Sequence, residues 1–256
     1  ETFLMSQEEK KQAIEIIVEE VNGRVPVIAH IGSIGTKITT ELGQYAEKIG
    51  VDALSALPPF YYGFSNDEIF NYYQDISNST NLPITVYNIS HAHLMDLDML
   101  KRLASIKNVK GVKYTAPTHF NFSKIKKEIG INFKIYSGMD EMSLSGLISG
   151  ADGIIGSFYN LMPELFVDIY AKIKEENINE AKKIQEKINI IIMYALSKSG
   201  YPFIKMGLNW LDVDSGYVRK PFTTFVDKEI ENIIKKDLKK LTDQNDLSGI
   251  KFLEKL

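Results

Sequence analysis

The stretch GVKYTAPTHF, Gly111–Phe120, begins as a short β-prone segment and is bounded by a proline. Its composition is typical of a buried strand, yet Lys113 stands in the middle of it. Burying an ammonium group is costly unless the charge is paired or neutralised. The lysine therefore needs a structural or a chemical explanation.

Strand-like and helix-like segments alternate on both sides of this stretch. Apolar runs typical of buried strands lie at residues 25–32, 51–58, 82–88, 111–116, 132–138 and 152–157. Helical patterns separate these strands. Another helical pattern precedes the first strand and begins with a capping box formed by Ser6 and Glu9. Each interval holds one strand and one crossover helix, which predicts a parallel sheet with helices outside it.

Six parallel strands are compatible with two architectures. An open doubly wound sheet of six strands is complete as it stands. A closed barrel needs eight strand–helix units. Periodicity alone does not separate the two.

The strand pattern stops near residue 160. Apolar stripes predict helices at residues 163–175, 178–199 and 226–241. The last stretch, residues 242–256, is polar and then briefly amphipathic, which predicts a surface tail or a small docking helix.

Composition excludes several classes of protein. The 256-residue chain has a net charge of -3 and therefore no basic footprint for nucleic acid. It has no cysteine, which excludes disulfides, thiolate metal sites and a cysteine nucleophile. No apolar run reaches the roughly 18 residues of a membrane span, and no signal-peptide pattern opens the chain, so a cytoplasmic protein is expected.

Sites in parallel α/β folds lie at the carboxyl ends of the strands. Polar candidates collect there: Tyr61, Tyr62, Tyr87, Lys113, Thr115, Gly138, Asp140 and Ser157. Lys113 and Thr115 share one face of their strand. An apolar interior favours the free amine that a Schiff-base nucleophile needs, and Tyr87 is the best-placed proton carrier by chain order. The plainer interpretation, which the pattern alone favours, is that Lys113 snorkels out of the strand or pairs with Asp140.

The other polar motifs are weaker. His30 is expected to be a hydrogen-bonded interior group, and His91-Ala92-His93 lacks the carboxylates or cysteines of a metal site. Asp140-Glu141 is either an acid pair or a charge complement to the following helix. No GxGxxG, Walker or zinc motif is present, so no nucleotide or metal is predicted.

Five segments, in this order, resemble the pyruvate-dependent class I aldolase family of N-acetylneuraminate lyase and dihydrodipicolinate synthase. They are SALPPFYYGFS (55–65), ITVYNI (84–89), GVKYTA (111–116), YSGMDE (136–141) and GADGIIGSFYN (150–160). The resemblance extends from about Glu1 to Phe222. It implies a (β/α)8 TIM barrel with a helical C-terminal extension, and usually a homotetramer. Residues 1–160 would be the barrel portion, and 161–256 the last barrel helix and the extension, within a single domain.

The resemblance also implies a lyase that cleaves N-acetylneuraminate (sialic acid) reversibly to N-acetylmannosamine and pyruvate, with no cofactor beyond an imine on Lys113. Tyr87 matches the proton-relay tyrosine, and Tyr61 matches a tyrosine near the site that can serve a neighbouring subunit. Positions that hold the sugar's hydroxyls and amide-bearing chain are matched by Thr115, Gly138, Asp140, Glu141 and Ser157.

Two features of the chain bear on the choice of substrate. The tyrosine segment continues as YNISHAH, without the arginine with which dihydrodipicolinate synthases typically grip the substrate carboxylate. A lyase is therefore preferred over a synthase-like or other 2-oxo acid aldolase. Ser90–His93 replaces the family's usual proline and Thr-Gly pair, which leaves the substrate preference open.

The resemblance further predicts that the first two barrel strands, with the Ser-Thr pair for the pyruvate carboxylate, lie upstream of Glu1. A non-catalytic barrel fragment is therefore a rival hypothesis. A six-stranded nucleotide-binding sheet ranks last, because HIGSIGTK (30–37) is a poor glycine-rich turn.

Overall fold

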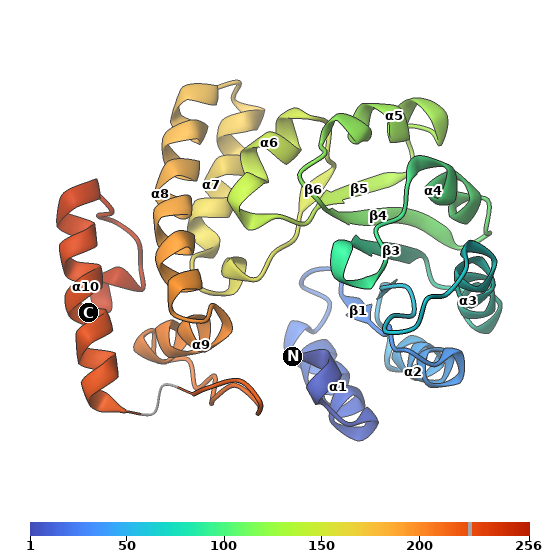
Figure 1. The fold of residues 1–256 in the computed structure, drawn as a ribbon, viewed down its shortest axis with the longest axis horizontal. Helices are drawn as coiled ribbons and strands as arrows, with labels where there is room; N and C mark the ends of the chain where they lie inside the picture. Colours follow the sequence, from blue (N-terminus) through green and yellow to red (C-terminus); the bar gives the residue numbers. More distant parts are fainter. Residues whose placement is uncertain (225–226) are drawn as a thin grey trace. The chain divides into compact units, whose positions relative to one another are not determined.

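The computed structural model describes residues 1–224 and 227–256, and Figure 1 traces the chain. The chain divides into two compact units. The α/β unit comprises Thr2–Met139 and Ser149–Ile154, and the helical unit comprises Glu1, Asp140–Ile148 and Ile155–Leu256.

The α/β unit is built on a curled parallel sheet (Figure 1). Its strands, among the described residues, are β1 (Ile28–His30), β2 (Ala53–Ala56), β3 (Ile84–Ile89), β4 (Val109–Thr115), β5 (Lys134–Ser137) and β6 (Gly153–Ile154). They lie side by side in chain order, each parallel to the next. This confirms the predicted parallel sheet. It also excludes the doubly wound alternative, because that sheet reverses its strand order partway across.

Helices follow one another along the outer side of this sheet (Figure 1). They are α1 (Gln7–Val21), α2 (Thr36–Ile49), α3 (Asn66–Ser79), α4 (Leu97–Ala104) and α5 (Phe120–Glu128). Ser6 and Glu9 form the predicted capping box at the start of α1, and Ser65 and Glu68 form a second one at α3. Each box satisfies two backbone donors that a helix start leaves unpaired.

The core of this unit lies between the sheet and its outer helices. Alternate strand residues such as Leu54, Val86 and Val112 are fully buried there. The Tyr73 side chain of α3 is also fully buried, and its hydroxyl donates to the Ala56 carbonyl at 2.8 Å. Since strand side chains alternate, the residues between these positions point to the other face of the sheet. That face carries Tyr87, Lys113 and Thr115.

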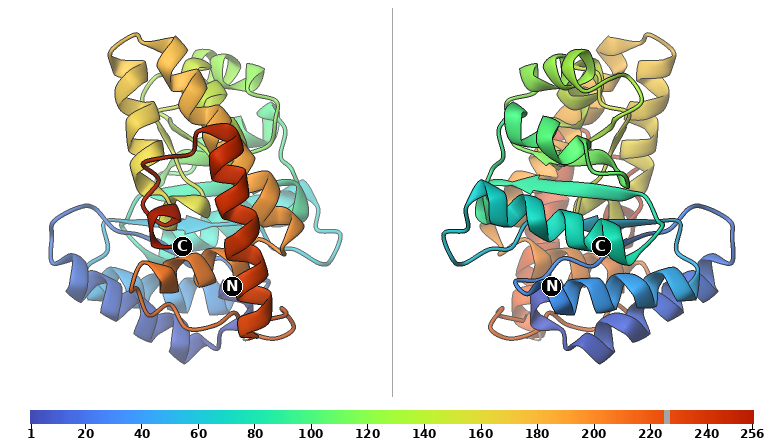
Figure 2. Two further views of the ribbon diagram at one scale, coloured as in Figure 1. Left: turned by 90° about the vertical axis from the view of Figure 1, so that its left-hand side faces the viewer. Right: turned by 90° about the vertical axis from the view of Figure 1, so that its right-hand side faces the viewer.

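The helical unit contains α6 (Ser143–Ile148), α7 (Pro163–Lys174), α8 (Ile178–Ser197), α9 (Tyr201–Trp210) and α10 (Lys228–Asn245). The long helices α7 and α8 lie side by side (Figure 2). The helices predicted at 163–175 and 178–199 are confirmed. The one predicted at 226–241 is confirmed from Lys228 and extends to Asn245, while residue 226 lies outside the described residues.

Two parts of the helical unit differ from the prediction. The α9 helix was not predicted; Pro202 stands in its first turn, where the absent N–H costs no helical hydrogen bond. The C-terminal segment is not a surface tail, because Leu247, Ile250 and Phe252 are buried. The Phe252 ring stacks on Trp210 of α9 with 6.5 Å between centroids, so the alternative of a docked segment is the correct one.

Within the described part of the chain, no helix has both the length and the apolar character that crossing a membrane requires.

Candidate active site

Lys113 and Tyr87 are direct register partners on the neighbouring strands β4 and β3. The Lys113 Nζ lies 4.1 Å from the centroid of the Tyr87 ring, a cation–π contact. Lys113 is half-buried rather than enclosed. On its other side, the register partner of Lys113 is Tyr136 of β5, which sequence analysis did not select. The period-2 alternation that placed Lys113 on this face could have placed Tyr136 there too.

Thr115 and Gly138 complete this group of residues. A Cβ atom added to Gly138 would stand 2.0 Å from Thr115 Oγ1 and 3.1 Å from Lys113 Cε. The Gly138 N–H donates to the Tyr114 carbonyl at 2.9 Å, which holds the backbone in this close approach. A glycine is therefore required at this position. Among the described residues, the buried Thr115 hydroxyl has no hydrogen-bond partner, so it is available to a ligand.

His30 of β1 lies beside the same group. Its ring meets the Tyr87 ring edge-on, with 6.0 Å between centroids. Its Nε2 atom is buried and has no hydrogen-bond partner in the described part of the chain, so the predicted hydrogen bonding of this histidine is wrong at that nitrogen. Burial lowers the pKa of His30 to about 4, and the charges of Lys113 and Lys10 act in the same direction. The imidazole is therefore neutral near pH 7.

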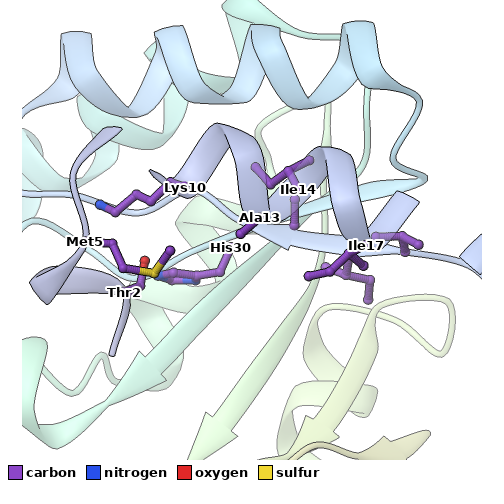
Figure 3. A pocket seen from close by; sticks show the side chains of 10 residues that line it. Thr2, Met5, Lys10, Ala13, Ile14, Ile17 and His30 are labelled. Atoms are coloured by element: carbon purple, nitrogen blue, oxygen red, sulfur yellow. The ribbon is translucent and has the colours of Figure 1, made fainter. Parts of the chain in front are cut away.

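A pocket of about 180 Å³ opens between α1 and β1 (Figure 3). Lys10 and His30 supply charged and titratable groups to walls that are otherwise mostly apolar, with Ile14 and Ile17 among them. Burial lowers the pKa of Lys10, because the ammonium loses water without gaining an equivalent environment. The Lys10 charge in turn contributes to keeping His30 neutral.

Asp140 has a structural role in the helical unit. Its buried carboxylate accepts the backbone N–H of Phe158 at 2.8 Å, which ties the turn at 140–142 to the turn at 156–158. A Cβ atom on Gly156 would stand 1.5 Å from Asp140 Oδ1, so this residue must also be glycine. Ser157 lies between these two contacts and is half-buried, whereas Glu141 is exposed.

Tyr61 and the histidine loop do not join the group around Lys113. The Tyr61 side chain is 85% exposed, and its ring contacts that of Tyr62 edge-on at 5.0 Å. His91 and His93 are exposed in the loop that follows β3. In the described part of the chain, no group of three histidine, aspartate or glutamate side chains could hold a metal ion.

The site residues thus fall into two sets. Lys113, Tyr87, Thr115 and Gly138 are brought together in the α/β unit. Asp140, Glu141 and Ser157 belong to two linked turns of the helical unit.

Known proteins resemble this chain over most of its length. A model of the dihydrodipicolinate synthetase family matches residues 1–241. The N-acetylneuraminate lyase of Fusobacterium nucleatum is 36% identical, with a TM-score of 0.86 over 96% of this chain and 83% of that one. CdNal of Clostridium difficile, solved in complex with mannosamine, is 33% identical, with a TM-score of 0.88 over 95% and 82%. The dihydrodipicolinate synthase of Aquifex aeolicus is 25% identical, with a TM-score of 0.84 over 92% and 81%.

Proposed function

The chain belongs to the dihydrodipicolinate synthetase family, and we propose that it cleaves N-acetylneuraminate reversibly into N-acetylmannosamine and pyruvate. The enzymes of this family are class I aldolases, which act through a covalent lysine Schiff base and use no metal or cofactor. The observation that carries the proposal is the pairing of Lys113 with Tyr87 on adjacent strands, next to an unpartnered threonine hydroxyl.

Lys113 is the nucleophile in this proposal. Its free amine attacks the C2 carbonyl of the 2-oxo acid, and loss of water leaves a protonated imine. The imine draws the electron pair of the C3–C4 bond as that bond breaks. Tyr87 relays the proton of the C4 hydroxyl: its phenolic oxygen accepts that proton as it gives up its own, so that N-acetylmannosamine leaves as the aldehyde. Protonation of the remaining enamine at C3 and hydrolysis of the imine then release pyruvate and restore the amine.

The remaining assignments follow the family resemblance. Thr115, Gly138, Asp140, Glu141 and Ser157 hold the hydroxyls and the amide-bearing chain of the sugar. Tyr61, which projects into solvent, serves a neighbouring subunit of a homotetramer. The curled sheet belongs to a (β/α)8 barrel, and the helices after residue 160 provide its last helix and a C-terminal extension.

The choice of sugar acid rests on two observations. The N-acetylneuraminate lyase of Fusobacterium nucleatum is 36% identical to this chain, whereas the dihydrodipicolinate synthase of Aquifex aeolicus is 25% identical. In addition, no arginine follows Tyr87 in the segment YNISHAH. The second candidate is the cleavage of another 2-oxo acid adduct, which the unusual loop Ser90–His93 favours.

The test is borohydride trapping in the presence of pyruvate, followed by intact mass measurement and peptide mapping. We expect one adduct, on Lys113, and pyruvate release from N-acetylneuraminate. Lys113→Arg removes both, whereas Lys110→Arg, on the same strand but exposed, is the matched control and changes neither. A folded protein without an adduct would be a non-catalytic barrel. A trapped adduct on Lys113 without cleavage of N-acetylneuraminate would instead support the second candidate function, the cleavage of another 2-oxo acid adduct.

A further inference from the structure

Gln185 of α8 is a buried polar residue on an apolar helix face. It shares that face with Ala181 and Ile188, both fully buried, and is itself only 7% exposed. Burying a side-chain amide is unfavourable unless its hydrogen bonds are made. Gln185 makes them within the helical unit. Its Oε1 accepts the Leu144 N–H at 2.9 Å, and its Nε2 donates to the Asp140 carbonyl at 3.2 Å and to Asn189 Oδ1 at 2.8 Å.

These contacts place a single amide group across the start of α6. The Leu144 N–H belongs to the first helical turn and has no partner inside the helix. The Asp140 carbonyl belongs to the 3-10 turn Asp140–Met142, which directly precedes α6. By binding both, Gln185 fixes the path of the chain from Asp140 to Leu144, which includes Glu141.

The fixed turn is joined to the turn that carries Ser157. Asp140 accepts the Phe158 N–H, as described above, and the Ser143 hydroxyl donates to the Asp140 carbonyl at 2.9 Å. That donation uses the only proton of the serine hydroxyl. In the contact of 2.8 Å between Ser143 and Tyr159, the tyrosine must therefore be the donor. Two hydrogen bonds thus hold the second turn against the first.

We propose that Gln185 is a positioning residue for the sugar-binding half of the site. This rests on the proposed function, in which Glu141 and Ser157 contact the sugar. Gln185 touches neither of them and acts through the two linked turns. Lys113 and Tyr87 lie in the α/β unit, and neither takes part in the hydrogen bonds described above. We therefore expect the reaction of Lys113 with pyruvate to persist when Gln185 is replaced.

The test compares wild type, Gln185→Met and Glu186→Gln. Methionine has a similar length and volume but makes none of the three hydrogen bonds, and Glu186 is an exposed neighbour on the same helix. We expect Gln185→Met to raise the KM for N-acetylneuraminate by about 10- to 100-fold, as expected when binding groups are misplaced. Its kcat is expected to change much less, and borohydride trapping of pyruvate on Lys113 to stay at the wild-type level. Glu186→Gln should match wild type throughout.

Amide hydrogen exchange supplies a readout that does not depend on the substrate. Gln185→Met should accelerate exchange at both Leu144 and Phe158, because the two turns loosen together. The positioning role would be overturned if Gln185→Met left KM unchanged or accelerated exchange at Leu144 alone. It would also be overturned if the variant lost pyruvate trapping as strongly as it lost affinity for the sugar acid. If the wild-type protein does not cleave N-acetylneuraminate, the proposed function fails, and the exchange at Phe158 still decides whether Gln185 holds the two turns.

Discussion

The ammonium of Lys113 lies over the face of the Tyr87 ring, 4.1 Å from its centroid, and the two residues are register partners on parallel strands. The contact uses the ring of the tyrosine, whereas the proposed proton relay uses its hydroxyl. The two roles can therefore be separated by substitution.

Tyr87→Phe keeps the ring and removes the hydroxyl. We expect pyruvate trapping on Lys113 to persist, while kcat for cleavage falls by about 10²- to 10⁴-fold, the usual contribution of general acid–base catalysis. Mass spectrometry after borohydride measures the first and a coupled pyruvate assay the second. Tyr62→Phe, at an exposed tyrosine, is the control. Wild-type turnover by Tyr87→Phe would remove Tyr87 from the mechanism.

Gly138→Ala is expected to disrupt the site locally. The new methyl group would stand 2.0 Å from Thr115 Oγ1, so the turn must shift away from Thr115 and Lys113. Since a displacement of about 1 Å can cost 10²-fold in rate, we expect kcat/KM to fall by at least about that factor. Gly63→Ala is the matched control, because its Cβ meets nothing within 4 Å. Equal activity of the two variants would contradict the close approach.

Thr115→Val tests the unpartnered hydroxyl. The substitution removes a buried polar atom that makes no hydrogen bond within the described chain. The free energy of unfolding should therefore stay the same or rise by about 1 kcal/mol, while KM for the substrate rises. Urea unfolding and steady-state kinetics measure the two effects. A loss of stability with unchanged KM would mean that the hydroxyl has a structural partner instead.

His30 should make stability depend on pH in a defined window. Burial and the nearby lysines lower its pKa in the folded protein to about 4, from an ordinary value of 6.5. Between these values the unfolded chain binds the proton more readily, so stability is full above about pH 6.5 and falls as the pH drops towards 4. The free energy of unfolding should decrease by about 2 kcal/mol from pH 8 to pH 5.

His30→Gln removes this titration. The free energy of unfolding, measured with urea, should fall less between pH 8 and pH 5 in the variant than in wild type. The two decreases should differ by roughly 2 kcal/mol. His91→Gln, at an exposed histidine, should keep the wild-type difference. If His30→Gln and wild type lose stability equally on acidification, the neutral buried imidazole is not responsible.

The strands were predictable because their signals are local. Apolar runs bounded by turn residues marked all six strands of the sheet that the structure describes. The predicted segments were longer than the strands, since β6 spans only Gly153–Ile154. Apolar character extends into the buried loops beyond the last ladder hydrogen bond, so pattern alone overestimates strand length.

The candidate site was only partly predictable. Lys113 was selected because a lysine stands out within an apolar strand, Tyr87 because chain order places it near Lys113, and the family resemblance supported both choices. Tyr136 and Gln185 were missed, since a tyrosine in a strand or one glutamine in a helix has no distinctive local signal. Two of the partners of Gln185, Leu144 and Asp140, lie 41 and 45 positions earlier in the chain.

The sequence by itself determined the alternation of strands and helices and the parallel sheet that they form, because propensity and periodicity act over a few neighbouring residues, and it marked Lys113 as the candidate nucleophile, because a lysine stands out within an apolar strand. Only the tertiary structure decided the strand order, the pairing of Lys113 with Tyr87, the close approach of Gly138 to Thr115 and the hydrogen bonds from Gln185 to Leu144 and Asp140. Register, close packing and buried hydrogen bonds depend on contacts between segments far apart in the chain, and no local pattern encodes those distances.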